Sequence, residues 1–242
     1  MIEPGAAAHV VEIPHTDSTN ADLLAALHAG ERWPHLGALV TRDQRGGRGR
    51  LDRTWIAPPG AALAISVVLR VFAVPLERRG WIPLAAGAAM TDAVAAQLPG
   101  AGVKWPNDVL VHGRKICGIL AQVADSETVV VGSGVNTRMT PEQLPTSTAT
   151  SFAVEGVDVD EGRLVADYLR RLGELTGALE RGSIADVVTA RCTTIGQRVT
   201  AHLPGDERLT GVATGLDELG CLVISGADRS ISVGDIVHLR PA

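Results

Sequence analysis

The stretch AGVKWPNDVLVHGRKICGILAQVADSETVVVGSGVN, residues 101–136, decides the predicted fold. It contains short, mainly apolar runs of strand length, and turn signals at Pro106-Asn107 and His112-Gly113 separate the first three. The first three runs, joined by these short turns, predict an antiparallel meander. The runs are 101–105, 108–111, 115–123 and 128–137. The last run is expected to be a buried strand that enters a glycine-rich turn.

Further strands and helices are predicted on both sides of this meander. Two runs rich in β-branched residues, 36–41 and 63–71, are bounded by Gly and Pro and indicate strands. Apolar residues at helical spacing indicate helices over 19–29, 81–98 and 161–182. Asp17 or Ser18 is placed to cap the first of these helices. The fold class is therefore α+β, a mixed sheet with flanking helices.

The pattern changes after about residue 190. Five short alternating runs separated by Gly, Pro and Asp follow one another there, which predicts a small closed or nearly closed β-barrel. We therefore expect two domains, a larger one over 1–190 and a small barrel over 191–242.

Composition excludes several classes of protein. The 242 residues carry 22 Lys and Arg against 27 Asp and Glu, a net charge of −5, which argues against a surface that coats nucleic acid. Cys117, Cys192 and Cys221 share no C-x-x-C spacing, which disfavours disulfides and structural zinc and favours the cytoplasm. Because no stretch reaches 18 uninterrupted apolar residues and no leader precedes the first apolar run, we expect a soluble protein without a membrane span.

The segment RDQRGGRGRLDR, residues 42–53, holds five arginines and three glycines. Arginine forks match phosphate oxygens, and glycine allows backbone amides to approach an anion, so the segment is suited to a phosphorylated ligand. From composition alone a solvated surface loop is an equally good interpretation.

Lys104 and Lys115 are the only lysines of the chain and lie close together in the predicted meander. A lysine ammonium is a compact charge suited to a carboxylate or a phosphoryl oxygen. The alternative is that Trp105 belongs to the core and Lys104 only reaches past it to solvent. The seven histidines show no H-x-x-x-H spacing, so no metal held by the protein is expected.

Taken together, the motifs closely resemble those of the biotin protein ligases, in the short form without an N-terminal DNA-binding domain. The resemblance runs from residue 15 to the C-terminal barrel, and the GRGR and KWPND motifs are its most specific part. The motifs are Asp17-Ser18-Thr19-Asn20, Gln44-x-x-Gly47-Arg48-Gly49-Arg50 followed by Trp55, Lys104-Trp105-Pro106-Asn107-Asp108, Lys115-Ile116-Cys117-Gly118-Ile119-Leu120 and Gly132-x-Gly134-Val135-Asn136.

The resemblance implies an SH3-like C-terminal barrel and an AMP-forming ligase. Such an enzyme uses ATP, with Mg²⁺, to activate biotin to biotinyl-5′-AMP. It then transfers biotin to one lysine of the biotin carboxyl carrier domain of an acyl-CoA or pyruvate carboxylase. A monomer or weak homodimer with no nucleic-acid partner is expected.

The resemblance also implies site residues. The catalytic candidates are Lys104, Arg48 and Arg50. The candidates for binding biotin or biotinyl-AMP are Ser18, Thr19, Asn20, Gln44, Gly47, Arg48, Gly49, Arg50, Lys104 and Gly118. The candidates for binding ATP are Trp55, Asn107, Lys115, Asn136 and Arg240. The arginine-glycine segment is expected to order over the anionic adenylate and exclude water from it. Asp52, where many relatives have Gly, and Cys117, where Ala is more usual, depart from the family pattern.

Three alternatives remain open at this point. A lipoate or octanoyl ligase or transferase shares the implied catalytic fold but is not expected to carry the GRGR and KWPND pair. A biotin-responsive transcriptional repressor would need an N-terminal winged helix, and too few residues precede Asp17 for one. An RNA-binding loop would need aromatic residues interleaved with the arginines of 42–53, and none is present.

Overall fold

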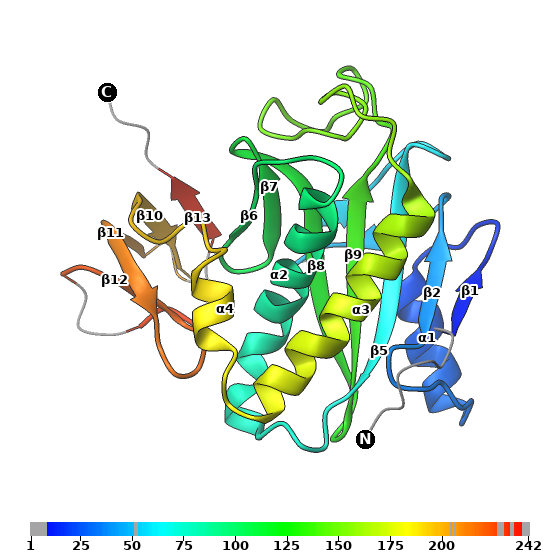
Figure 1. The fold of residues 1–242 in the computed structure, drawn as a ribbon, viewed down its shortest axis with the longest axis horizontal. Coiled ribbons are helices and arrows are strands. Elements are labelled where there is room, and N and C mark those ends of the chain that lie inside the picture. Colours follow the sequence, from blue (N-terminus) through cyan, green and yellow to red (C-terminus); the bar gives the residue numbers. More distant parts are fainter. Residues whose placement is uncertain are drawn as a thin grey trace.

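The computed structural model describes residues 9–50, 53–203, 205, 207–226, 230–232 and 235–238. Its largest element is a seven-stranded sheet in the order β1-β2-β5-β9-β8-β7-β6 (Figure 1). The β1–β2 pair is parallel and the other neighbours are antiparallel. The strands are β1 Val10–Glu12, β2 Ala38–Thr41, β5 Ala62–Arg70, β6 Ala101–Lys104, β7 Asp108–Val111, β8 Arg114–Asp125 and β9 Thr128–Asn136.

The predicted meander is confirmed, since β6, β7 and β8 pair in sequence order, and β9 continues it beside β8. The predicted glycine-rich turn at the end of this stretch is wrong. Gly132 and Gly134 lie inside β9, where they pair with Leu120 and Gly118 of β8. These glycines are required by packing, because a Cβ at Gly132 would lie 2.4 Å from Asn20 Oδ1 and one at Gly134 would lie 2.6 Å from the Trp55 ring.

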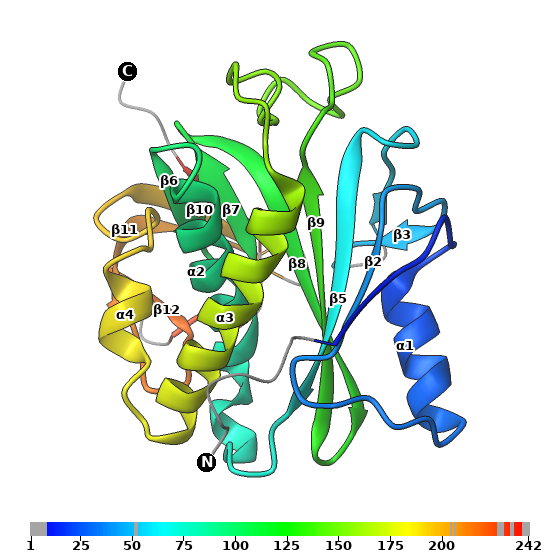
Figure 2. The same ribbon diagram turned by 45° about the vertical axis from the view of Figure 1, so that its right-hand side comes forward.

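Helices cover both faces of the sheet (Figure 2). On one face, α2 (Ile82–Ala95) and α3 (Glu161–Glu180) pack side by side and close the main hydrophobic core, and a 3-10 helix, Leu76–Trp81, leads into α2. On the other face, α1 (Thr19–His28) closes a smaller cluster around Leu23. Ser18 caps α1 by accepting a hydrogen bond from the Ala21 amide, so one of its two predicted caps is observed.

The C-terminal part forms a second, four-stranded antiparallel sheet in the order β12-β11-β10-β13. It follows α4 (Ala185–Thr189), and its strands are β10 Arg198–His202, β11 Arg208–Leu216, β12 Leu222–Ile224 and β13 Asp235–His238. The fourth predicted run, 229–233, contributes through its described residues a bridge between Ile231 and Leu222, and the fifth contains β13. The α+β class is thus confirmed, and the domain boundary near residue 190 stays a prediction.

The short hairpin of β3 (Gly47–Arg48) and β4 (Thr54–Trp55) was not predicted. It folds the arginine-glycine segment back over the sheet beside α1, which places it at the site described next (Figure 2). Among the residues that the structure describes, no helix combines the length and the apolar character needed to cross a membrane.

Candidate active site

A cavity of about 400 Å³ lies between the α1 N-terminus, the β3–β4 hairpin and the central strands. Most of the site residues predicted from the sequence line this one cavity. They are Ser18, Thr19, Asn20, Gln44, Arg48, Gly49, Arg50, Trp55, Lys104, Asn107, Lys115 and Gly118. Segments separated by up to a hundred residues are therefore brought together as the motifs implied.

Three predicted residues are not among those that line the cavity. Gly47 lies behind it, where a Cβ would approach both Gln44 Nε2 and the Trp55 carbonyl to 2.5 Å, so its role is to allow close packing. Asn136 is buried at the end of β9, and its amide donates to the Thr150 carbonyl at 2.9 Å. Arg240 lies outside the described residues.

Ten further lining residues were not named as site candidates from the sequence, although most of them stand in the quoted motifs or in the 42–53 segment. They are Arg53, Thr54, Ala64, Pro106, Asp108, Ile119, Leu120, Gly132, Ser133 and Gly134. The register of β5, β9 and β8, which aligns Ala64 with Gly134 and Gly134 with Gly118, brings many of them together. Ser66 was also missed, although a lone serine within the apolar run LAISVVL was a usable signal.

The orientation of the Gln44 amide is fixed by a backbone donor. Both the Thr19 N–H and the Thr19 hydroxyl donate to Gln44 Oε1, at 2.9 and 3.0 Å. Because a backbone N–H can only donate, Oε1 must face Thr19. Gln44 therefore presents its Nε2 amino group, a donor, as its remaining polar atom.

The orientation of the Asn20 amide is fixed in the opposite sense. Its Nδ2 donates to the Leu120 carbonyl at 3.2 Å and to Gln122 Oε1 at 2.8 Å, which uses both of its N–H groups. Its Oδ1 accepts from the buried Ser66 hydroxyl at 2.6 Å. Asn20 Oδ1 thus keeps one acceptor lone pair beyond that bond, and Asn20 and Gln44 line the same cavity.

The five arginines of 42–53 divide into two groups. Arg48, Arg50 and Arg53 line the cavity, and Arg50 donates to Asn107 Oδ1 at 3.1 Å. Outside the cavity, Arg42 pairs with Glu12 and Glu161, and Arg45 pairs with Asp43. The solvated-loop interpretation therefore does not describe the second half of the segment.

The two lysines stand on either side of Asp108. Lys104, at the end of β6, is the register partner of Asp108, and Lys115 Nζ lies 2.6 Å from Asp108 Oδ1. A Cβ at Gly118 would lie 3.2 Å from Lys115 Nζ, so glycine leaves room for the ammonium group. Cys117, the residue before Gly118, is buried, and its burial raises the pKa of its thiol, which keeps the thiol neutral.

The lining carries five cationic side chains and, among the described residues, one carboxylate, that of Asp108. The Trp55 ring lies directly over Gly134 and adds an aromatic wall. Such a cavity suits an anionic ligand that also carries a flat apolar part.

Comparison with known proteins identifies the family. Residues 12–136 match the biotin/lipoate A/B protein ligase family, and residues 194–239 match the biotin protein ligase C terminal domain. The chain belongs to the biotin/lipoate A/B protein ligase family. The second match covers the small C-terminal sheet, which confirms that this sheet is part of the ligase architecture.

Individual members of the biotin/lipoate ligase family are similar over most of their length. The chain is 40% identical over 237 residues to the biotin–[acetyl-CoA-carboxylase] ligase of Mycobacterium tuberculosis, covering 94% of this chain and 88% of that protein. It is 29% identical to the bifunctional ligase/repressor BirA of Escherichia coli, covering 89% and 68%. Its structure is similar to that of a biotin protein ligase from Aquifex aeolicus solved with biotin and ATP, with a TM-score of 0.79, 26% identity and coverage of 96% and 99%.

Proposed function

We propose that this chain is a biotin protein ligase that activates biotin with ATP to biotinyl-5′-AMP and transfers biotin to a lysine of a carboxylase biotin carrier domain. The observation that carries the proposal is a single cavity with two features. One is a donor and acceptor pair, the oriented amides of Gln44 and Asn20. The other is a cationic wall, formed by Arg48, Arg50, Arg53, Lys104 and Lys115. Biotin presents a cyclic urea at one end and a carboxylate at the other, and the cavity offers a partner for each.

The donor and acceptor pair suits the ureido ring. A urea has a carbonyl that accepts and N–H groups that donate. Gln44 Nε2 is placed to donate to the former and Asn20 Oδ1 to accept from the latter, since both amides are held by backbone groups on their other side. The dithiolane ring of lipoate has neither kind of group, so binding it would leave both amides unpaired at a cost. This feature favours biotin over the lipoate alternative.

The cationic wall suits the chemistry of adenylation. A carboxylate oxygen attacks the α-phosphorus of ATP, the new acyl–phosphate bond forms, and pyrophosphate leaves with its electron pair. Lys104, Arg48 and Arg50 line the cavity, and their charges would neutralise the negative charge that spreads over the phosphoryl oxygens. Lys115, next to Asp108, adds a second point charge on the same wall.

The second half of the arginine-glycine segment is proposed to retain the adenylate. Arg50 reaches across to Asn107, which comes from the β6–β7 turn, so the hairpin side and the sheet side of the cavity are linked. Keeping water away from the mixed anhydride leaves the acceptor lysine amine as the nucleophile. That amine attacks the acyl carbon, the acyl–phosphate bond breaks, AMP leaves, and the amine releases one proton as the amide forms.

The residues present also fit Mg²⁺ carried in with ATP. Within the described part of the chain no cluster of three or more His, Cys, Asp or Glu side chains is placed to hold a metal ion. Asp108 is the one carboxylate among the described lining residues. This donor set suits an ion held mainly by phosphate oxygens and water, and bound Mg²⁺ would neutralise phosphate charge.

The test is ATP-dependent labelling of a purified biotin carrier domain. The full chain is incubated with the carrier domain, ATP and Mg²⁺, with biotin in one arm and lipoate in the other. We expect an amide-linked biotin on one lysine and no lipoylation of that domain or of a lipoyl domain supplied in parallel. Lipoylation without biotinylation would contradict the proposal.

A further inference from the structure

Trp105 lies within residues 104–107, here called the cavity segment, and its side chain contacts the C-terminal part of the chain. Its neighbours in sequence, Lys104 and Pro106, line the cavity. Trp105 itself is 2% exposed and is not among the lining residues. The Trp105 indole Nε1 donates to the Gly220 carbonyl at 3.1 Å. The Trp105 backbone N–H donates to Thr194 Oγ1 at 3.0 Å. Both partners belong to the C-terminal part of the chain.

The turn that receives the Trp105 indole is itself well held. Asp217 Oδ1 accepts from the amides of Leu219 and Cys221, each at 2.9 Å, which closes the turn. The Trp81 indole donates to the Glu218 carbonyl at 2.9 Å. Two buried tryptophans thus anchor one turn, 217–220, and only Trp105 belongs to the cavity segment.

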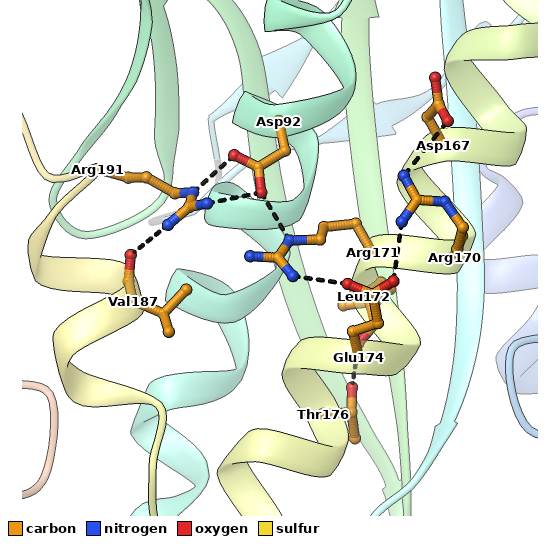
Figure 3. A network of polar contacts seen from close by, with 9 residues as sticks. All are labelled: Asp92, Asp167, Arg170, Arg171, Leu172, Glu174, Thr176, Val187 and Arg191. Carbon is orange, nitrogen blue, oxygen red and sulfur yellow. Dashed lines mark hydrogen bonds and ion pairs between the residues drawn. The ribbon is translucent and has the colours of Figure 1, made fainter.

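The strand before Trp105 is fixed from the same direction. At the sheet edge, the Val103 N–H donates to the Arg191 carbonyl and the Thr193 N–H donates to the Val103 carbonyl, both at 2.8 Å. Figure 3 shows how Arg191 is held, by two contacts of its guanidinium with Asp92 of α2, which also binds Arg171 of α3. The chain around 191–194 that bonds to β6 is therefore itself held by α2 through Asp92.

The far end of the cavity segment is held by β8. Asn107 Nδ2 donates to the Ile119 carbonyl, and the Ile119 N–H donates to the Asn107 carbonyl, both at 2.8 Å. Lys104 and Asn107 therefore lie between two anchors, one on β8 and one on the C-terminal part. Loss of either anchor would let the cationic wall shift.

We propose that Trp105 is a positioning residue, through which turn 217–220 sets the place of Lys104 and Asn107 for adenylate formation. The inference rests on the proposed function and goes beyond it, because it assigns the C-terminal sheet a part in the first chemical step. Trp105 contacts no substrate in this role. It acts through its two hydrogen bonds to residues 194 and 220.

Trp105→Phe and Trp81→Phe form a matched pair. Each removes one indole N–H from a fully buried tryptophan that donates to a carbonyl of the same turn, and only the first lies in the cavity segment. For Trp105→Phe we expect kcat of biotin-dependent pyrophosphate release to fall about tenfold with the Kd for biotin unchanged, because small displacements of catalytic groups are costly. Trp81→Phe should keep kcat within about twofold of wild type at a similar loss of Tm.

Amide hydrogen exchange at Ile119 gives a readout independent of activity. Its protection depends on the Asn107 carbonyl, so it should fall in Trp105→Phe and persist in Trp81→Phe. If Trp105→Phe does not fold, Thr194→Val removes the acceptor of the Trp105 amide instead and should give the same two changes. Equal kcat and equal Ile119 protection in the two tryptophan variants would overturn the inference. A wild-type chain without biotin-dependent activity would instead contradict the proposed function, and the exchange comparison would still test the positioning contact.

Discussion

Thr19 donates twice to Gln44, through its backbone N–H at 2.9 Å and its hydroxyl at 3.0 Å, and both bonds end on Oε1. This double contact joins the first turn of α1 to the arginine-glycine segment, 25 residues away. It also decides which end of the Gln44 amide remains for a ligand. The chemistry that we propose for the cavity depends on that choice.

We expect Gln44→Glu to weaken biotin binding by about 1–3 kcal/mol, which corresponds to about fivefold to 150-fold in Kd. The variant keeps the shape and the acceptor toward Thr19 but replaces the Nε2 donor by an acceptor. Titration calorimetry with biotin measures the effect. Gln143→Glu is the matched control, because the exposed Gln143 also accepts from a backbone N–H, that of Thr140, at 3.0 Å and lies outside the cavity. Equal affinities for both variants would contradict the assignment.

Arg50→Gly should leave adenylate synthesis partly intact and shorten the residence of biotinyl-AMP by about tenfold, the effect of losing one charged hydrogen-bond donor. Released adenylate would then label bystander lysines. Single-turnover release kinetics provide the measurement. Arg45→Gly, a change of the same kind in the same segment but at an arginine paired with Asp43, should behave as wild type. Unchanged release in Arg50→Gly would remove Arg50 from this role.

Lys104→Ala should lower the rate of pyrophosphate release with biotin and ATP by about a hundredfold, since it deletes a cation aimed at the developing charge. Lys115→Ala, assayed in parallel, separates the two lysines that stand beside Asp108. Arg114→Ala serves as the control, because Arg114 pairs with Glu155 outside the cavity. A near-normal rate for Lys104→Ala together with a large loss for Lys115→Ala would reassign this charge-neutralising role to Lys115.

Gly134→Ala should raise the KM for ATP, because the added methyl group would lie 2.6 Å from the Trp55 ring and displace it. The size of the change depends on how far the ring moves, and we expect at least about tenfold if its contact with the nucleotide is lost. Gly215→Ala is the matched control and should leave the KM unchanged. Gly215 is also a strand glycine, and a Cβ there meets nothing within 4 Å. An unchanged KM in Gly134→Ala would argue against Trp55 as a nucleotide contact.

Much of the fold could be predicted because its elements carry local signals. The helix over Thr19–His28 has its cap and spacing in the sequence, and the meander from 101 has turn residues between its strands. The Gly132–Asn136 stretch was misread because glycine marks a turn in most local contexts. Here it marks two places where side chains from distant segments rest on a strand, which only the tertiary packing determines.

The site residues, like the fold, were predicted only in part. Lys104 and Arg50 were named because they stand in the KWPND and GRGR motifs, which carry the family resemblance. Ser66 and Gln122 were not, because a buried hydroxyl and a strand glutamine become meaningful only once Asn20 lies against them. The division of the arginines was also hidden, since the carboxylates that bind Arg42 come from β1 and α3.

Exchange of labelled pyrophosphate into ATP tests the central claim most directly, because it reports adenylate formation without any acceptor protein. With the full chain, ATP and Mg²⁺, we predict exchange that depends on biotin, is absent with lipoate, and is lost in Lys104→Ala. Exchange supported by lipoate and not by biotin, or no exchange with either, would contradict the account.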